Sequence, residues 1–199
     1  MTTTTSPDTD LHVSPPANPV STLEGTWDID PSHSEVSFVI RHLMVSKVRG
    51  TFNGFSGSFV VGDSLASSSV QADIAVASID TNSVDRDAHV RSADFFDVDQ
   101  FPTMTYRSTG VRADGDDYVV DGNLSLHGVT HPVTLQLEVL GFVPETPFGD
   151  TRVGFSASGE IDRRDFGLEW NAPVKGGGVV LGTKIRIALE IEAIRRSEA

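Results

Sequence analysis

Short segments of alternating apolar and polar residues, separated by glycines, run along most of this 199-residue chain. A period of two places successive side chains on opposite faces of a β-strand. The alternation predicts strands over residues 36–42, 48–61, 70–76, 103–112, 118–126, 133–142, 152–161 and 179–193, with a further short candidate at 26–29. About eight antiparallel strands commonly close into a small barrel. The pattern therefore predicts an all-β fold of barrel type.

The connections between these segments are mostly too short to hold crossover helices, which favours antiparallel neighbours. Asp114-Gly115 is typical of a hairpin turn, and residues 128–132 resemble a second tight connection. The phase of the apolar positions changes between Phe52 and Phe55, which predicts a bulge or bend near Gly54.

Two longer connections interrupt the strand pattern. Residues 81–102 can hold a short helix capped by Asn82 or Ser83, which we expect to pack across one opening of the barrel. Residues 163–178 are too rich in glycine for regular structure throughout and are expected to form a flap.

Residues 1–24 are dominated by Thr, Ser, Pro and Asp. Such a segment cannot bury enough apolar surface to offset the entropy of ordering it, so we expect a flexible N-terminal tail followed by one domain over residues 25–199. The first residues lack the basic and apolar stretches of a secretory signal, which predicts a cytoplasmic protein.

Charge and composition exclude several classes of function. The chain has 28 acidic against 15 basic residues, a formal charge of −13, and such a surface repels nucleic acid and anionic bilayers. No apolar run reaches the length of a membrane-spanning helix, so stable membrane insertion is not expected. The absence of cysteine excludes thiol nucleophiles and zinc–thiolate sites.

The motifs that resemble catalytic sites are each incomplete. Residues 54–58 resemble a hydrolase nucleophile elbow but lack its final glycine, and residues 165–167 spell the kinase magnesium triplet without any nucleotide loop. His127 and His131 flank a turn, so the helical geometry that would aim both at one metal is missing. We therefore expect no catalytic residue, no metal site and no cofactor.

A series of fragments resembles the YceI-like family of bacterial lipid-binding proteins. The fragments are, in chain order, WDIDPSHS at 27–34, RHLMVSKVRG at 41–50, ASIDT at 77–81, RDAHVRSADFFD at 86–97, FP at 101–102, LHGVT at 126–130 and RRDFG at 163–167. The resemblance covers about residues 25–194. It implies a lipocalin-like antiparallel β-barrel, extended and closed by a helical segment, whose apolar tunnel holds a long-chain isoprenoid lipid such as an isoprenoid quinone or its precursor.

The more continuously apolar face of each strand is expected to face the tunnel. This rule and the distribution of aromatic residues select as tunnel residues Phe38, Ile40, His42, Phe52, Ile74, Val76, Phe95, Phe96, Phe101, Tyr106, Leu124, Leu126, Phe155, Phe166 and Trp170. Ordinary core packing remains the alternative for each aromatic residue, and a hydrogen-bonded core position remains the alternative for His42.

Selectivity for a head group would come from the mouth of the tunnel. Arg41, Arg91 and Arg163 are the candidates, because cationic donors can meet a diphosphate, a quinone carbonyl or an amide. Structural ion pairs with Asp94 or Asp165 are the alternative for Arg41 and Arg163.

Three functions remain open at this point. The preferred one is non-enzymatic binding of the lipid, for carriage or sequestration. The alternatives are an enzyme that modifies an isoprenoid and an interaction module with a solid core. A homodimer also stays open, because strand pairing and edge exposure cannot be judged from the sequence.

Overall fold

The structure is a computed structural model that describes residues 19–175 and 177–197. The described residues form eleven strands: β1 (Gly25–Ile29), β2 (Glu35–His42), β3 (Ser46–Phe52), β4 (Phe55–Val61), β5 (Ser69–Ala75), β6 (Ile79–Asp80), β7 (Thr103–Asp114), β8 (Asp117–Leu126), β9 (Val129–Val143), β10 (Arg152–Asp162) and β11 (Leu181–Arg195). The helices are α1 (Pro19–Leu23) and α2 (Val84–Arg91), with short 3-10 helices η1 (Leu65–Ser67), η2 (Val76–Ser78) and η3 (Arg163–Phe166).

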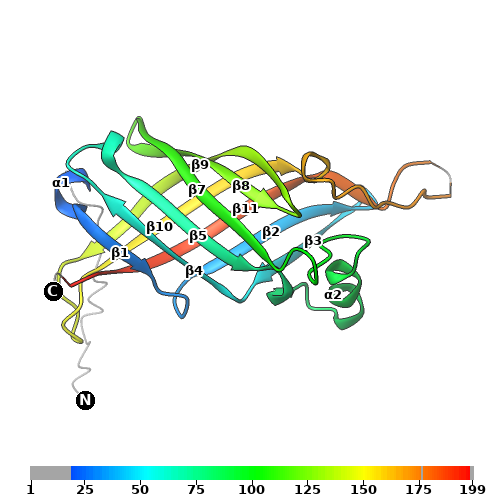
Figure 1. Ribbon diagram of the computed structural model, residues 1–199, viewed down its shortest axis with the longest axis horizontal. Helices are drawn as coiled ribbons and strands as arrows, with labels where there is room; N and C mark the ends of the chain where they lie inside the picture. The colour runs from blue at the N-terminus through cyan, green and yellow to red at the C-terminus, as the bar shows by residue number, and fades with distance from the viewer. Residues whose placement is uncertain (1–18, 176, 198–199) are drawn as a thin grey trace, which may run out of the picture.

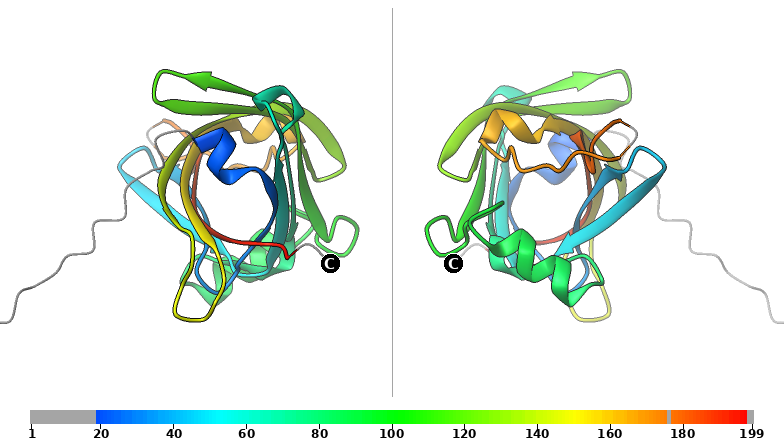
Figure 2. Two further views of the ribbon diagram at one scale, coloured as in Figure 1. Left: turned by 90° about the vertical axis from the view of Figure 1, so that its left-hand side faces the viewer. Right: turned by 90° about the vertical axis from the view of Figure 1, so that its right-hand side faces the viewer.

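Eight of the strands form a closed ring in the order β1-β4-β5-β7-β8-β9-β10-β11. Antiparallel pairing of β1 with β11, in which Trp27 lies opposite Arg195, closes the ring. The view along the barrel axis in Figure 2 shows this closure. The prediction of an antiparallel barrel of about eight strands is confirmed.

The remaining strands, β2, β3 and β6, extend the barrel wall beyond the ring (Figure 1). This is achieved because β11 is long enough to pair with β1 near its C-terminal end and with β2 over residues 181–190. The chain leaves β3 and enters β4 at Asn53-Gly54, which confirms the predicted bend near Gly54.

Both predicted tight connections join neighbouring antiparallel strands. Gly115, with a φ of +65°, lies in the turn between β7 and β8. The second connection is shorter than predicted, because β9 already begins at Val129 and contains Pro132 opposite Asn123. Pro132 is tolerated there because β10 pairs only with the part of β9 from Gln136 onward, so that no ladder bond on that side is lost.

The expected helix within residues 81–102 is present as α2, which begins after Ser83. Asp87 stabilises this start from inside the helix, accepting hydrogen bonds from the backbone N–H of Thr81 at 2.9 Å and from its hydroxyl. Helix α2 lies beside β3 at one end of the molecule (Figure 1). Among the described residues, no helix is both long enough and apolar enough to cross a membrane.

Helix α1 was not predicted. The expected tail over residues 1–24 lies mostly outside the described residues, but Pro19–Leu23 are helical and Leu23 is buried. Leu23 packs in a core cluster with Trp27 and Phe59, so the ordered structure begins before residue 25.

Candidate ligand-binding site

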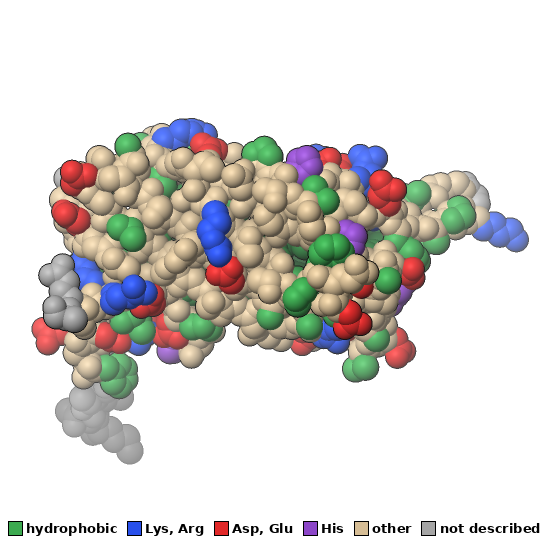
Figure 3. All heavy atoms as spheres, viewed as in Figure 1, with side chains coloured by type: hydrophobic (Ala, Val, Ile, Leu, Met, Phe, Trp, Pro, Cys, Tyr) green, Lys and Arg blue, Asp and Glu red, His purple; other side chains and the backbone are tan. Residues whose placement is uncertain are grey.

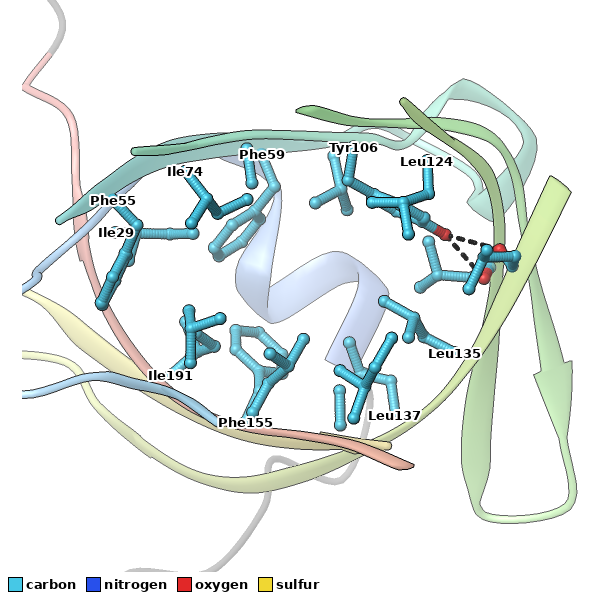
Figure 4. A pocket seen from close by; sticks show the side chains of 18 of the residues that line it. Ile29, Phe55, Phe59, Ile74, Tyr106, Leu124, Leu135, Leu137, Phe155 and Ile191 are labelled. Atoms are coloured by element: carbon cyan, nitrogen blue, oxygen red, sulfur yellow. Dashed lines mark hydrogen bonds between the residues drawn. The ribbon is translucent and has the colours of Figure 1, made fainter. Parts of the chain in front are cut away.

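An elongated apolar cavity occupies the inside of the barrel (Figure 4). Its wall arises from strand alternation. In β9, for example, Val133, Leu135, Leu137 and Val139 line the cavity, whereas the residues between them are exposed. The same period of two in β5 and β8 turns a row of mostly apolar side chains inward from each strand, and Gly122 interrupts the row of β8.

The interior is hollow rather than filled by side chains. Ile29, Phe55, Leu137 and Ile191 point into it in Figure 4, yet each is only half-buried, because no neighbouring side chain covers it from the inside. The centre of a water-sized sphere can occupy about 260 Å³ of this space. One water needs only about 10–15 Å³ by the same measure.

The cavity wall has few polar groups that could bind water. Its polar side chains are those of Ser37, Ser68, Ser69, Tyr106 and Tyr118, and no charged residue is among the described residues that line it. The Tyr106 hydroxyl already donates towards the carbonyl oxygens of Val120 at 3.1 Å and Val133 at 3.2 Å. Burial raises the pKa of Tyr106, so this group stays neutral. A roomy cavity with so few free polar partners suits an apolar occupant.

Helix α1 lies across one end of the cavity (Figure 4), which it lines with Val20 and Leu23. Trp27 Nε1 donates a 2.7 Å hydrogen bond to the carbonyl oxygen of Leu23, and Arg195 donates a 2.7 Å bond to that of Thr22. These bonds hold the last turn of α1 against the barrel.

Towards the opposite end, η3 and the chain that follows it pack on the barrel, with Phe166 and Leu168 buried in a core cluster with barrel residues. Arg163 is also buried and donates hydrogen bonds to the carbonyl oxygens of Leu168, Trp170 and Gly182. The predicted flap over residues 163–178 thus begins with the regular helix η3. We keep the name flap for the described residues 171–175 and 177–180, whose base these bonds hold.

Two of the cavity-lining residues, Val60 and Ser69, are exposed, and both lie close to η1. Leu65 of η1 and Ser68 also line the cavity and are half-buried. We therefore place the approach to the cavity between η1 and α1.

Eight of the fifteen predicted tunnel residues line the cavity. Those that line it are Phe38, Phe52, Ile74, Phe96, Tyr106, Leu124, Leu126 and Phe155. Phe96 reaches it from the loop that follows α2, at the edge of a core cluster around Phe52. These residues come from β2, β3, β5, β7, β8, β10 and that loop.

The other predicted tunnel residues lie outside the cavity wall. Ile40 and His42 continue the β2 face that carries Phe38, and Val76 packs beside Phe52 and Ile79. Phe95 and Trp170 form an aromatic cluster with His89, with ring centroids about 5 Å apart. Phe101 packs on His127 and Phe166 on His131.

The predicted head-group arginines do not line the cavity either. Arg91 donates to the carbonyl oxygens of Ala77 and Ile79, so it fixes the end of α2 against η2 and β6. Arg163 is bound to three carbonyl oxygens, as described above. Arg41 is exposed on β2, and Asp94 lies 2.9 Å from His89 Nε2 instead of pairing with Arg41 or Arg163.

Several lining residues were missed at the level of sequence. Leu135, Leu137, Ile187 and Leu189 follow a clear alternation in predicted strands, so the rule of the apolar face could have identified them. Val20 of α1 carries no comparable signal, because Val20 and Leu23 are too few apolar positions to predict a helix in a segment rich in Pro, Ser and Thr.

One cluster outside the cavity has the composition of a metal site. Asp30, His33 and Glu192 bring potential ligand atoms within 4.8 Å of one another. Arg152, however, forms ion pairs with both Asp30 and Glu192, so a cation already occupies the centre of this cluster. We interpret it as an ion-pair network.

Comparison with known proteins identifies the family. A family model described as the YceI-like domain matches residues 27–193. The chain belongs to the YceI-like family. This YceI-like chain is 44% identical over 142 residues to a UPF0312 protein of Enterobacter sp. (strain 638), covering 71% of this chain and 73% of that protein. It is 41% identical over 143 residues to Protein YceI of Escherichia coli O17:K52:H18, covering 71% and 74%.

Solved structures share the YceI-like barrel. The Campylobacter jejuni YCEI protein matches with a TM-score of 0.64 and 26% identity, covering 79% of this chain and 91% of that one. BcnA of Burkholderia cenocepacia has a TM-score of 0.70 at 23% identity, with 82% and 98% covered. A polyisoprenoid binding domain from Saccharophagus degradans has a TM-score of 0.65 at 19% identity, with 85% and 98% covered. Because the last two proteins are less than 25% identical to this chain, they show only that the fold is similar.

Proposed function

We propose that this YceI-like barrel binds a long-chain polyisoprenoid or a related amphiphilic lipid in its cavity, for carriage or sequestration and without catalysis. The observation that carries the proposal is the hollow of about 260 Å³ whose lining contains no charged side chain among the described residues. The Saccharophagus degradans structure of similar fold supports it, since that protein is described as a polyisoprenoid binding domain.

Burial of the lipid tail is sufficient to supply the affinity. Transfer of a five-carbon isoprene unit from water into an apolar cavity contributes up to about 4 kcal/mol. Immobilisation of each torsion subtracts about 0.5 to 1.5 kcal/mol. Micromolar binding needs about 8 kcal/mol, so a few buried units reach it without any charged anchor.

An uncharged head group fits the approach to the cavity better than a diphosphate. Beside η1 the cavity is lined by the hydroxyls of Ser68 and Ser69. That of Ser68 already donates to the carbonyl oxygen of Ser64 at 3.0 Å, so the Ser69 hydroxyl is the group that can bind a quinone carbonyl or a prenol hydroxyl. The nearby Asp63 carboxylate is exposed and would repel an anion. An isoprenoid quinone or its precursor is therefore our proposed ligand. The cytoplasmic location and the homodimer stay predictions.

The test is solvent extraction of the purified protein and mass spectrometry of the extract. We expect a stoichiometric long-chain lipid from the wild type and little from Ala72→Phe. Ala72 is half-buried on the cavity wall, so a phenyl ring there enters the hollow instead of a packed core and should reduce the free energy of unfolding less than the same ring at a fully buried alanine.

Ala193→Phe is the matched control, because Ala193 is fully buried against Trp27 and lines no cavity. Overpacking at this position should destabilise the protein by about 1–3 kcal/mol. If the wild type yields no lipid and Ala72→Phe is as destabilising as Ala193→Phe, the interior is a solid core and the proposal is wrong. Lipid retained by a folded Phe38→Asp or Leu126→Asp variant would likewise contradict it.

A further inference from the structure

The turn between β2 and β3 lies at one end of the barrel (Figure 1) and carries three consecutive apolar residues. Leu43, Met44 and Val45 are 40%, 56% and 84% exposed. Leu43 and Met44 also have φ values of 50° and 60°, a left-handed conformation that is costly for residues other than glycine. The fold thus projects an apolar tip, Leu43–Val45, into solvent instead of packing it.

Cations surround this tip. Arg41 and Lys47 face each other across the β2–β3 pair, Arg49 follows two residues later, and all three are exposed. Residues 36–62 contain no acidic residue at all, although the whole chain carries a formal charge of −13. The net charge predicts repulsion from anionic surfaces, but the β2–β3 hairpin that carries the Leu43–Val45 tip is itself basic.

The flap adds to the same surface. The backbone N–H of Leu43 donates a 2.7 Å hydrogen bond to the carbonyl oxygen of Val180, so the returning strand of the flap lies against the tip. Within the flap, Lys175 is exposed and Val179 is 41% exposed. Figure 3 shows hydrophobic and basic side chains together on this projecting end. Acidic residues also lie at this end: Asp85 and Asp94 belong to α2 and the loop after it, and Asp165 of η3 and Glu169, which precedes the flap, are exposed.

We propose that the Leu43–Val45 tip docks the protein on an anionic lipid bilayer by inserting its apolar side chains at the boundary between head groups and acyl chains. A single weak signal gives only marginal membrane binding, and stable attachment generally needs two, such as an apolar group that inserts and basic residues that attract anionic lipids. The tip and its cations supply both. A protruding apolar point fits a fluid interface better than a protein partner, which would need a matching pocket.

Docking through the tip would place the β2 side of the barrel wall next to the membrane. The β2 face that carries Phe38 in the cavity continues through Ile40 and His42 to the tip. This inference goes beyond the proposed function, because docking requires no occupied cavity and can be measured without identifying a cargo.

The test is cosedimentation of the full chain with phosphatidylcholine vesicles that contain or lack phosphatidylglycerol. We expect binding only to the anionic vesicles and progressive release as salt is raised. Leu43→Ser/Met44→Ser/Val45→Ser should abolish it. Arg41→Gln/Lys47→Gln/Arg49→Gln should weaken it, by about fivefold for each cation removed. All six side chains are exposed apart from their hairpin contacts, so circular dichroism should confirm that both variants fold.

Phe148→Ser is the matched control, because Phe148 is 87% exposed but belongs to the connection between β9 and β10, which lies at the α1 end in Figure 1. It should bind vesicles as the wild type does. Equal binding to neutral vesicles, or unchanged binding by both tip variants, would overturn the proposal. The proposal would also be overturned if the wild type self-associated without binding vesicles and the tip variants lost this self-association. Lipid extracted from the tip variants should match the wild type, which keeps the two proposals separable.

Discussion

Tyr106 shows how one glycine shapes the cavity wall. Its ring passes over Gly122 of β8, where the hydroxyl reaches the carbonyl oxygens of Val120 and Val133. A Cβ atom at Gly122 would overlap the end of the Tyr106 ring and would lie only 2.8 Å from the carbonyl oxygen of Arg107. The absent side chain of Gly122 is therefore what lets Tyr106 fold flat against the wall.

We expect Gly122→Ala to destabilise the protein by about 1–3 kcal/mol, because the added methyl group must displace Tyr106 or the backbone. Urea denaturation of the variant and the wild type measures this difference. Gly110→Ala is the control, since a Cβ atom there meets nothing within 4 Å, and its effect should stay within about 0.5 kcal/mol. Equal effects of the two substitutions would contradict this role of Gly122.

At the scale of an element, α1 depends entirely on the barrel. A helix of five residues is far too short to be stable alone in water. It persists because Leu23 is buried and because Trp27 and Arg195 bind its last carbonyl oxygens. Since α1 also covers one end of the cavity, its opening would control exchange of the contents.

We expect Leu23→Ala to favour opening of α1 by about 2 kcal/mol or more, because it removes most of the buried apolar surface of the helix. Hydrogen exchange at the α1 amides should accelerate, while the barrel strands keep their protection. A bound prenyl chain should also dissociate faster. Glu24→Ala, at an exposed position next to α1, should change neither quantity. Unaltered α1 exchange in Leu23→Ala would disprove the dependence.

At the scale of the whole molecule, an ion-pair network joins three distant segments of the chain. Arg152 at the start of β10 contacts Asp30 at 2.9 Å, Asp150 at 2.8 Å, and Glu192 of β11. Hydrogen bonds from His33, the Ser32 backbone and Arg152 lower the pKa of Asp30 from its usual 3.8 to about 2. The folded state therefore holds a proton on Asp30 less readily than the unfolded chain does.

A depressed carboxyl pKa contributes stability above the unfolded value near 3.8, and this contribution is lost as the pH falls towards about 2. We expect the free energy of unfolding to decrease from pH 4 to pH 2 and to decrease less steeply in Asp30→Asn. Urea denaturation over this pH range provides the measurement. Asp85→Asn, on exposed α2, should retain the wild-type slope. A slope that Asp30→Asn leaves intact would show that other groups cause it.

Local pattern alone was enough to identify the elements of the wall. Alternation revealed the strands, Gly54 revealed the bend, and Asp114-Gly115 revealed a hairpin, because each depends on neighbours within a few residues. The same alternation separated the inward from the outward face of β5 and β8, where Ile74 and Leu124 line the cavity. These features can be predicted from the sequence because strand geometry repeats every two residues.

Tertiary structure decided the rest. Alternation says which face of β2 is apolar, but the register with β11 decides that Phe38 reaches the cavity and Ile40 lies beyond it. No local signal shows that Arg163 binds backbone carbonyl oxygens instead of a ligand, or that α1 covers an end of the barrel. The Arg163 contacts depend on how the η3–β11 connection folds back on itself. The place of α1 depends on ring closure, which joins residues more than a hundred positions apart, such as Trp27 and Arg195.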